Sequence, residues 1–422
     1  MHTKFEHPLS FETAGAAREI GLERTLVSDE YHVEFSRMTR HLPLQSLYAS
    51  TYLKSAESHL SQLISSDNLK EIFAVARYFP GNLTSFLGFE CRLGDPEARA
   101  DWAFAVSGSG EDRRVLINLL KEGYIPDGFL EQPEWQQIIN FASSWCDPHS
   151  ILQDKVKCFW LEFDMPKTLP ETPIPSVFFG PTSLPENASS NDIKQYKWLT
   201  KTALPLLTGK PLSKTIEQNI NKCIKQMPLN TSLFQIGTML SRSTSNGIRL
   251  YITRLQPQQI IPYLQAIGWP YPTEEIKALI DDIQEKAERF VLSFDVIKEG
   301  IGPRVGIECS FVSDNFHQET RWNQLLDYLV DKKLCLPEKR DALLHYSGTS
   351  DFSGGIMKPL TSASHDLNDI LTSTITRYIS HVKIVYQPDR PLEAKAYPAV
   401  RLFGHSKESI HEESRMTTEG GT

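Results

Sequence analysis

The feature that most constrains this chain is a hairpin pattern that recurs along it. The stretch "LEFDMPKTLPETPIPSVFFGP" (161–181) and the stretch "LSFDVIKEGIGPRVGIECSF" (292–311) each read as an apolar strand, a turn and a second alternating strand. The turns carry Pro or Gly, which interrupt a strand and favour chain reversal. A unit that recurs at a distance predicts a repeat architecture, in which each copy covers part of a shared core.

Five such hairpins can be identified, and stretches with helical periodicity separate them. The hairpins are 86–108, 159–181, 232–255, 290–311 and 381–403. The helical stretches between them come in pairs, such as 112–125 with 133–146 and 256–268 with 272–290. We predict a helical lead-in over 1–80, one barrel domain of five repeats over 81–404, and a disordered polar tail over 405–422.

The strands alternate apolar residues with polar or small ones, so each strand has two different faces. In the stretch 304–311, Val305 and Ile307 share one face, while Arg304 and Glu308 share the other. If helix pairs cover the apolar faces, the polar faces meet either solvent in an open layer or one another in a closed barrel. Closure removes two exposed sheet edges. The fold class predicted is therefore α+β, a closed antiparallel barrel of about ten strands with a lumen wide enough for a ligand.

Composition narrows the classes of function. The formal net charge is -8 and no basic run occurs, which argues against a nucleic-acid or membrane partner. No apolar stretch reaches membrane-spanning length and no signal-peptide core is present, so we predict a cytoplasmic protein. The six cysteines and twelve histidines form no metal-binding spacing, and we predict no metal site.

With these hairpins in view, the chain resembles the aromatic prenyltransferases of the ABBA barrel, especially the dimethylallyltryptophan-synthase-like indole enzymes. The likeness rests on the repeat order and on hairpins such as 161–181 and 292–311, and it spans about residues 80–403. It implies transfer of an isoprenoid from an allylic diphosphate to an aromatic or peptide acceptor in natural-product biosynthesis. It also implies that no cofactor is needed and Mg²⁺ is not required, and the expected assembly is a monomer or homodimer.

The resemblance also implies roles for individual residues. It places a catalytic carboxylate that anchors the acceptor and accepts a proton on Glu90. Basic and phenolic side chains would stabilise the leaving diphosphate and shield the carbocation. The residues in those positions are Arg249, Tyr251, Lys395, Tyr397 and Arg401.

An acceptor pocket would involve Glu308 and an aromatic floor. Trp102, Trp160 and Phe178 form that floor if they point inward, and otherwise belong to the core. The chain departs from the family at several of the positions that would surround the diphosphate. Ser176 and Phe178 replace a Lys-x-Tyr in the fourth strand, Gly306 and Glu308 replace one in the eighth, and the second strand lacks an expected Arg.

The residues themselves also allow roles other than those that the resemblance implies. Glu90 can pair with Arg92 or Arg304, and Arg249 and Lys395 can pair with Glu162 or Glu308. Asp164 and Asp295 are interpreted as turn residues. The alternative function is therefore a catalytically altered prenyltransferase-like barrel that binds a peptide or hydrophobic small molecule without diphosphate chemistry. Four or more basic side chains converging in the lumen would favour the enzyme, whereas neutralised pairs would favour binding.

Overall fold

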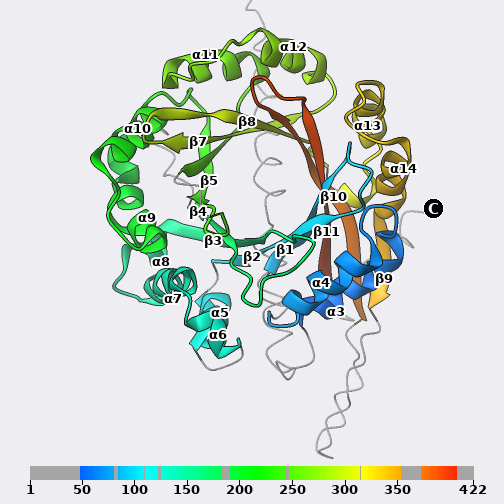
Figure 1. The fold of residues 1–422 in the computed structure, drawn as a ribbon, viewed down its shortest axis with the longest axis horizontal. Coiled ribbons are helices and arrows are strands. Elements are labelled where there is room, and N and C mark those ends of the chain that lie inside the picture. The colour runs from blue at the N-terminus through cyan, green and yellow to red at the C-terminus, as the bar shows by residue number, and fades with distance from the viewer. Residues whose placement is uncertain are drawn as a thin grey trace, which may run out of the picture.

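A closed antiparallel β-barrel with an outer ring of helices forms the molecule (Figure 1). The structure is a computed structural model that describes residues 48–79, 84–108, 110–121, 125–182, 191–242, 247–313, 315–352 and 372–405. Strands β1 to β8 follow one another around the sheet, β8 pairs with β10, and β10 and β11 close the ring onto β1. The predicted fold class is confirmed.

The strands agree with the five predicted hairpins, with one addition. They are β1 (Thr84–Arg92), β2 (Ala100–Ser107), β3 (Val156–Phe163), β4 (Ser176–Pro181), β5 (Ser232–Thr238), β6 (Ile248–Thr253), β7 (Arg289–Ile297), β8 (Gly300–Ser310), β9 (Gly348–Phe352), β10 (Thr372–Tyr386) and β11 (Glu393–His405). The addition is β9, which pairs along the first part of β10. Its residues begin a Ser/Gly-rich stretch, a composition that gives no strand signal in the sequence.

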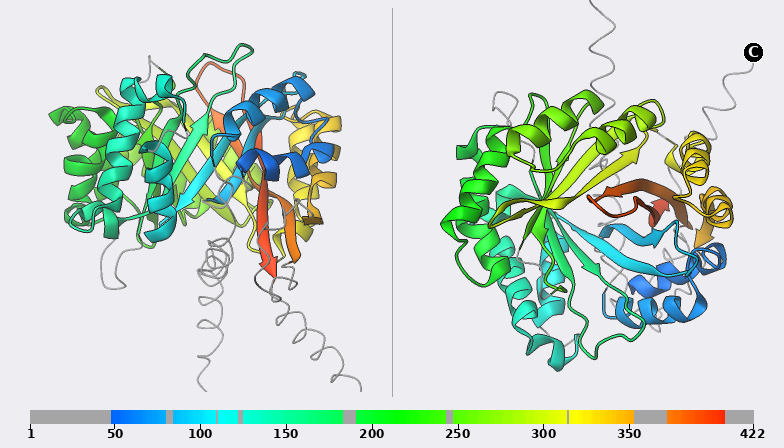
Figure 2. Two further views of the ribbon diagram at one scale, coloured as in Figure 1. Left: turned by 90° about the horizontal axis from the view of Figure 1, so that it is seen from below. Right: turned by 45° about the horizontal axis from the view of Figure 1, so that its top comes forward.

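Helices cover the outer face of the barrel, as the two further views show (Figure 2). They are α3 (Ala49–Ser55), η2 (Glu57–His59), α4 (Ser66–Ala76), α5 (Gly110–Lys121), α6 (Asp127–Leu130), α7 (Pro133–Cys146), α8 (Ile151–Lys155), η4 (Ile193–Tyr196), η5 (Leu199–Ala203), α9 (Leu204–Thr208), α10 (Lys214–Lys225), α11 (Pro257–Ile267), α12 (Glu274–Ile283), η6 (Phe316–Gln318), α13 (Trp322–Asp331) and α14 (Pro337–Tyr346).

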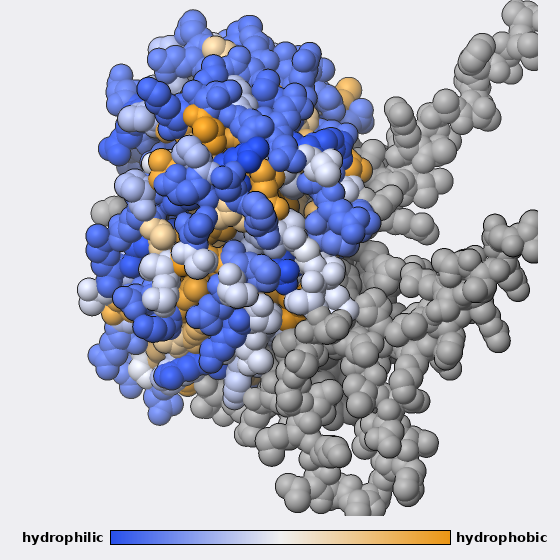
Figure 3. All heavy atoms as spheres, turned by 90° about the vertical axis from the view of Figure 1, so that its right-hand side faces the viewer, coloured by the Kyte–Doolittle hydropathy of each residue, from blue (hydrophilic) through white to orange (hydrophobic). Residues whose placement is uncertain are grey.

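Most of these helices bury apolar side chains, whereas η2 and η6 bury no residue. In α12, the stripe of Ile276, Leu279, Ile280 and Ile283 is buried. The N-terminus of α10 is capped by Ser213, whose hydroxyl accepts a hydrogen bond from the Ile216 N–H. On the face that carries α13 and α14, hydrophilic side chains predominate and apolar ones are scattered (Figure 3).

The lead-in helices lie against the barrel where its sheet closes. Helix α3 contacts β11, and α4 contacts β2. Of the predicted lead-in, residues 1–47 lie outside the described residues. Of the predicted tail, His405 belongs to β11 and residues 406–422 lie outside the described residues.

Candidate functional site

Strand alternation separates two environments in this barrel. The outward side chains of β1, Leu87, Phe89 and Cys91, belong to the large apolar cluster that also contains the buried faces of the helices. The inward face of the same strand carries Glu90. Polar side chains of the other strands join it inside the barrel, so the predicted assignment of apolar faces outward and polar faces inward is confirmed.

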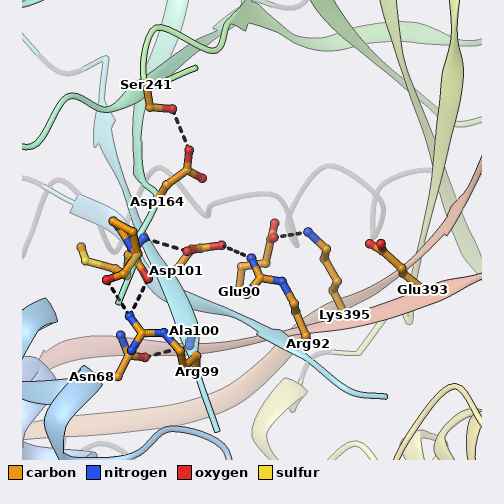
Figure 4. Close-up of polar contacts among 12 residues, drawn as sticks. Asn68, Glu90, Arg92, Arg99, Ala100, Asp101, Asp164, Ser241, Glu393 and Lys395 are labelled. Atoms are coloured by element: carbon orange, nitrogen blue, oxygen red, sulfur yellow. Dashed lines mark hydrogen bonds and ion pairs between the residues drawn. The ribbon is translucent and has the colours of Figure 1, made fainter. Parts of the chain in front are cut away.

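The Glu90 carboxylate is the centre of one inward cluster. It accepts hydrogen bonds from the Lys395 ammonium and the Tyr397 hydroxyl, both from β11 (Figure 4 shows the ion pair with Lys395). Burial alone would raise the pKa of Glu90, but the charge and hydrogen bond of Lys395, with the hydrogen bond of Tyr397, hold it well below its usual value. Glu90 is therefore ionised and paired across the β1–β11 seam.

Lys383, which sequence reasoning did not identify, is the centre of a second inward cluster. Its Nζ lies 3.1 Å from Glu308 Oε1 and 4.6 Å from the centroid of the Tyr251 ring. The neighbouring inward residue on β10, His381, stacks on the Tyr397 ring with centroids 4.0 Å apart. Stacking joins the two clusters into one polar belt across the lumen.

A glycine makes room for Lys383. A Cβ atom at Gly306 would lie 2.4 Å from Lys383 Cε and 2.5 Å from Ser293 Oγ, both closer than real atoms approach. Gly306 lies on β8, and the basic side chain beside it comes from the neighbouring strand of the barrel, β10. The signal in the sequence was the alternation of His381, Lys383 and Val385 in the last hairpin.

Two bidentate ion pairs lie near one end of the lumen. Arg249 donates to both carboxylate oxygens of Asp295, at 2.8 and 3.0 Å. Arg242 binds Asp164 in the same way, at 3.1 and 2.8 Å, and Ser241 also donates to Asp164 (Figure 4). The interpretation of the two aspartates as turn residues is wrong, because in the closed barrel their side chains meet arginines of another hairpin.

Other predicted partners also differ from the observed ones. Arg92 pairs with Asp101 at 3.2 Å, and Arg304 approaches Glu393 at 3.5 Å. Neither is the partner of Glu90 that we predicted. Arg401, the fifth residue implied for diphosphate binding, is half-buried on β11 opposite Thr376 and does not line the central cavity.

Glu162 differs from every other inward acid. It lines the central cavity, and no hydrogen bond or ion pair joins its carboxyl to another described residue. Burial, reinforced by the negative charge of Glu90, raises the pKa of Glu162 to about 7, against the opposing charges of Lys383 and Arg249. Glu162 therefore exchanges a proton near neutral pH and has no competing partner among the described residues.

The predicted aromatic floor divides between the two faces. Trp102 is fully buried beneath the helices, with its ring 5.4 Å from Phe163 and 6.0 Å from Phe79. This corrects the expectation that Trp102 lines an acceptor pocket, because on β2 the alternation turns Ala103 and Ala105 inward and Trp102 outward. Its place is the core, the alternative that the sequence left open.

Trp160 and Phe178 do point inward. Phe178, Tyr251 and Met239 form a buried cluster against which Trp160 packs, and the rings of Phe178 and Tyr251 meet edge to face at 5.6 Å. The ring of Trp160 also lies 5.1 Å from that of Phe86. An apolar wall thus adjoins the polar belt, and it contacts the central cavity through Met239 and Tyr251.

The central cavity is small. Its volume is about 30 Å³, roughly the space that one water molecule occupies in the liquid. Paired charged side chains and aromatic rings surround this cavity. That the lumen as a whole is wide enough for a ligand stays a prediction.

The residues that the structure describes contain no group of three or more His, Cys, Asp or Glu side chains placed to hold a metal ion. Within those same ranges, no helix has the length and apolar character needed to cross a bilayer.

The chain matches no family model and no curated protein. Solved structures do resemble it. The prenyltransferase PriB in its apo form is 10% identical, with a TM-score of 0.50, over 83% of this chain and 95% of PriB. AnaPT from Neosartorya fischeri is 11% identical, with a TM-score of 0.47, over 88% of this chain and 98% of AnaPT. At this identity the likeness to PriB shows a shared fold, the prenyltransferase barrel.

Proposed function

We propose that this prenyltransferase-like barrel binds a cationic or neutral aromatic molecule bearing an N–H group, and does not ionise an allylic diphosphate. One observation supports this proposal. The five described basic side chains that line the central cavity all pair with carboxylates, whereas the lining carboxyl of Glu162 has no such partner among the described residues. In the part of the chain that the structure describes, the cavity therefore offers a proton acceptor and no unpaired cation.

A diphosphate needs basic donors that are free to turn toward it, because it carries about two to three negative charges at neutral pH. Here Lys395 and Lys383 would have to leave Glu90 and Glu308, which are buried with them. Removing one member of a buried ion pair costs about 3–5 kcal/mol. The carboxylates left behind would then repel the ligand.

A cationic aromatic molecule meets the opposite conditions. Its positive charge would lower the pKa of Glu162, which is about 7, and so form an ion pair in a water-poor site. Trp160, two residues earlier on the same face of β3, and Tyr251 present aromatic surface beside it. Aromatic rings attract cations by about 0.5–2 kcal/mol. A neutral indole N–H would use Glu162 as an acceptor instead.

The ion pair of Arg242 and Asp164 is the part of the cavity lining that can separate to admit such a ligand. Their side chains are 40% and 36% exposed, against 8% and 9% for Lys383 and Glu308. Exposed ion pairs contribute about 0–1 kcal/mol, so opening this pair costs little. We infer that entry to the lumen begins there.

Calorimetry with four ligands tests the proposal. Tryptamine carries an indole and a positive charge, and indole-3-propionate carries the same ring with a negative charge. We expect tryptamine to bind and indole-3-propionate to bind at least about tenfold more weakly. Tryptamine affinity should rise from pH 6 to pH 8 as Glu162 ionises. Glu162→Gln should remove that rise, whereas the exposed control Glu338→Gln should keep it.

Dimethylallyl and geranyl thiolodiphosphates are the other two ligands. No binding at high micromolar concentration is expected. Binding that is lost in Arg249→Ala would instead support the second candidate, a prenyl transferase, which is favoured by the convergence of Glu90, Lys395 and Tyr397 on the lumen. In that case Glu90→Gln should abolish transfer and leave donor binding intact, and the binding proposal would be dropped.

A further inference from the structure

A second cavity lies outside the barrel, on the ring of helices. Residues of α8 and of the segment 194–202 line it, and its volume is about 400 Å³. Figure 1 shows α8 and the following helix α9 on the outer ring. We name it the lysine groove, after a lining that includes Ile151, Lys155, Lys194, Lys197, Trp198 and Lys201.

The charge of the lysine groove is opposite to that of the whole chain. Four lysines line it and none of the described lining residues is acidic, whereas the chain has a formal net charge of -8. Lys201 pairs with Glu217 at 2.7 Å. No ion pair with a described residue involves Lys155, Lys194 or Lys197. Like charges gathered without acidic partners repel one another, and an anionic ligand would relieve that repulsion.

Apolar surface accompanies these charges. The described residues include three large hydrophobic side chains that are exposed: Ile151 at 46%, Ile193 at 39% and Leu229 at 72%. Ile151 is in the groove lining, and Ile193 begins η4, the helix that supplies Lys194. Trp198 lies at the same cavity with only 6% of its surface exposed. Apolar and basic groups therefore occupy one concave site.

The backbone beside Trp198 is unusual. Leu199–Ala203 is a π-helix, and Trp198 is the residue that precedes it. π-Helical turns are rare, and they are frequently found at functional sites. Here the wide turn places Lys197, Trp198 and Lys201 at a single cavity.

We propose that the lysine groove docks an acidic amphipathic peptide segment of a partner protein. Its apolar side chain would cover Ile151 and Trp198, and its carboxylates would lie against Lys155, Lys194 and Lys197. Charge complementarity with the four lysines, together with the exposed apolar surface of Ile151, favours this occupant. The proposal does not depend on what the lumen binds.

Fluorescence anisotropy tests it with the full chain. The probe is a fluorescein-labelled helical peptide of about 12 residues built from Glu and Leu, and the matched peptide has Gln in place of Glu. We expect the Glu peptide to bind, with a dissociation constant that rises about tenfold between low and high salt, and the Gln peptide to bind far more weakly.

Charge reversal locates the site. Lys194→Glu/Lys197→Glu should raise the dissociation constant at least about tenfold, and Ile151→Ser should raise it about threefold. The control Lys225→Glu/Lys298→Glu has the same net charge but alters exposed lysines outside the groove, and it should change affinity less than about twofold. Circular dichroism confirms that each variant is folded.

Four results would overturn the proposal. They are no binding of the Glu peptide at about 1 mM, equal weakening by the two double variants, and equal competition by inorganic tripolyphosphate, which would make the site one for small anions. The fourth is tighter binding of a synthetic peptide of residues 406–422, which would make the occupant a segment of this chain.

Discussion

The outward and inward faces of the strands differ in the interactions that stabilise their side chains. The outward face is a single apolar cluster shared with the helices, in which Trp102, Phe104 and Phe159 have no exposed surface. The inward face holds charged pairs and a smaller set of aromatic rings. The outward face thus stabilises the barrel by burial, whereas each inward charge depends on one specific partner.

This difference indicates where the chain can change its chemistry. A substitution on the outward face alters the core on which all the hairpins rest. On the inward face, the charge of Lys383 on β10 occupies space that Gly306 on the neighbouring strand β8 leaves open. The lumen can therefore acquire a new ligand preference while the barrel keeps its fold.

The largest expected effect contrasts two tryptophans on opposite faces. Trp102→Ala should lower the free energy of unfolding by about 3–5 kcal/mol, because it empties a closed apolar core. Trp160→Ala, the inward control, should cost less than half as much, since Trp160 is only partly buried. Urea denaturation measures both. Equal losses would show that the two faces contribute alike.

The ion pair of Glu90 and Lys395 should show the next effect. Glu90→Leu and Lys395→Met each leave a buried charge unpaired and should each cost about 3 kcal/mol, whereas the double variant should cost less than either. The same cycle on Lys277 and Asp281, an exposed pair at 2.7 Å, should give a coupling of about 0.3–0.5 kcal/mol. A coupling that small in the lumen would contradict our account of the inward face.

The smallest effect concerns Glu162 and depends on pH. Its pKa is raised to about 7 in the folded protein, so its favourable contribution is complete below the ordinary pKa of about 4.3 and is lost as the pH rises through 7. Glu162→Gln should therefore raise the free energy of unfolding at pH 8 by up to about 3 kcal/mol, because each pKa unit corresponds to about 1.4 kcal/mol, and change it little at pH 4. If the difference in the free energy of unfolding between the two proteins did not change with pH, protonation of Glu162 would not be its cause.

Much of the fold could be predicted from local patterns. The hairpins and the stripe of α12 follow from spacing alone, because a side chain's face is set by its position in a strand or helix. The site was less accessible. The identity of Trp102 alone does not indicate whether its side chain points inward or outward. The small side chains of Ala103 and Ala105 on the other face of the strand do indicate that the inward face has little space.

The sequence by itself determined that each strand has an apolar and a polar face, and that five hairpins share one pattern. The tertiary structure alone decided which charges meet. Lys395 reaches Glu90 across 305 residues of sequence, and Lys383 reaches Glu308 across 75. Such partners depend on the register of strands that become neighbours when the barrel closes. The alternation of residues within one strand does not specify that register.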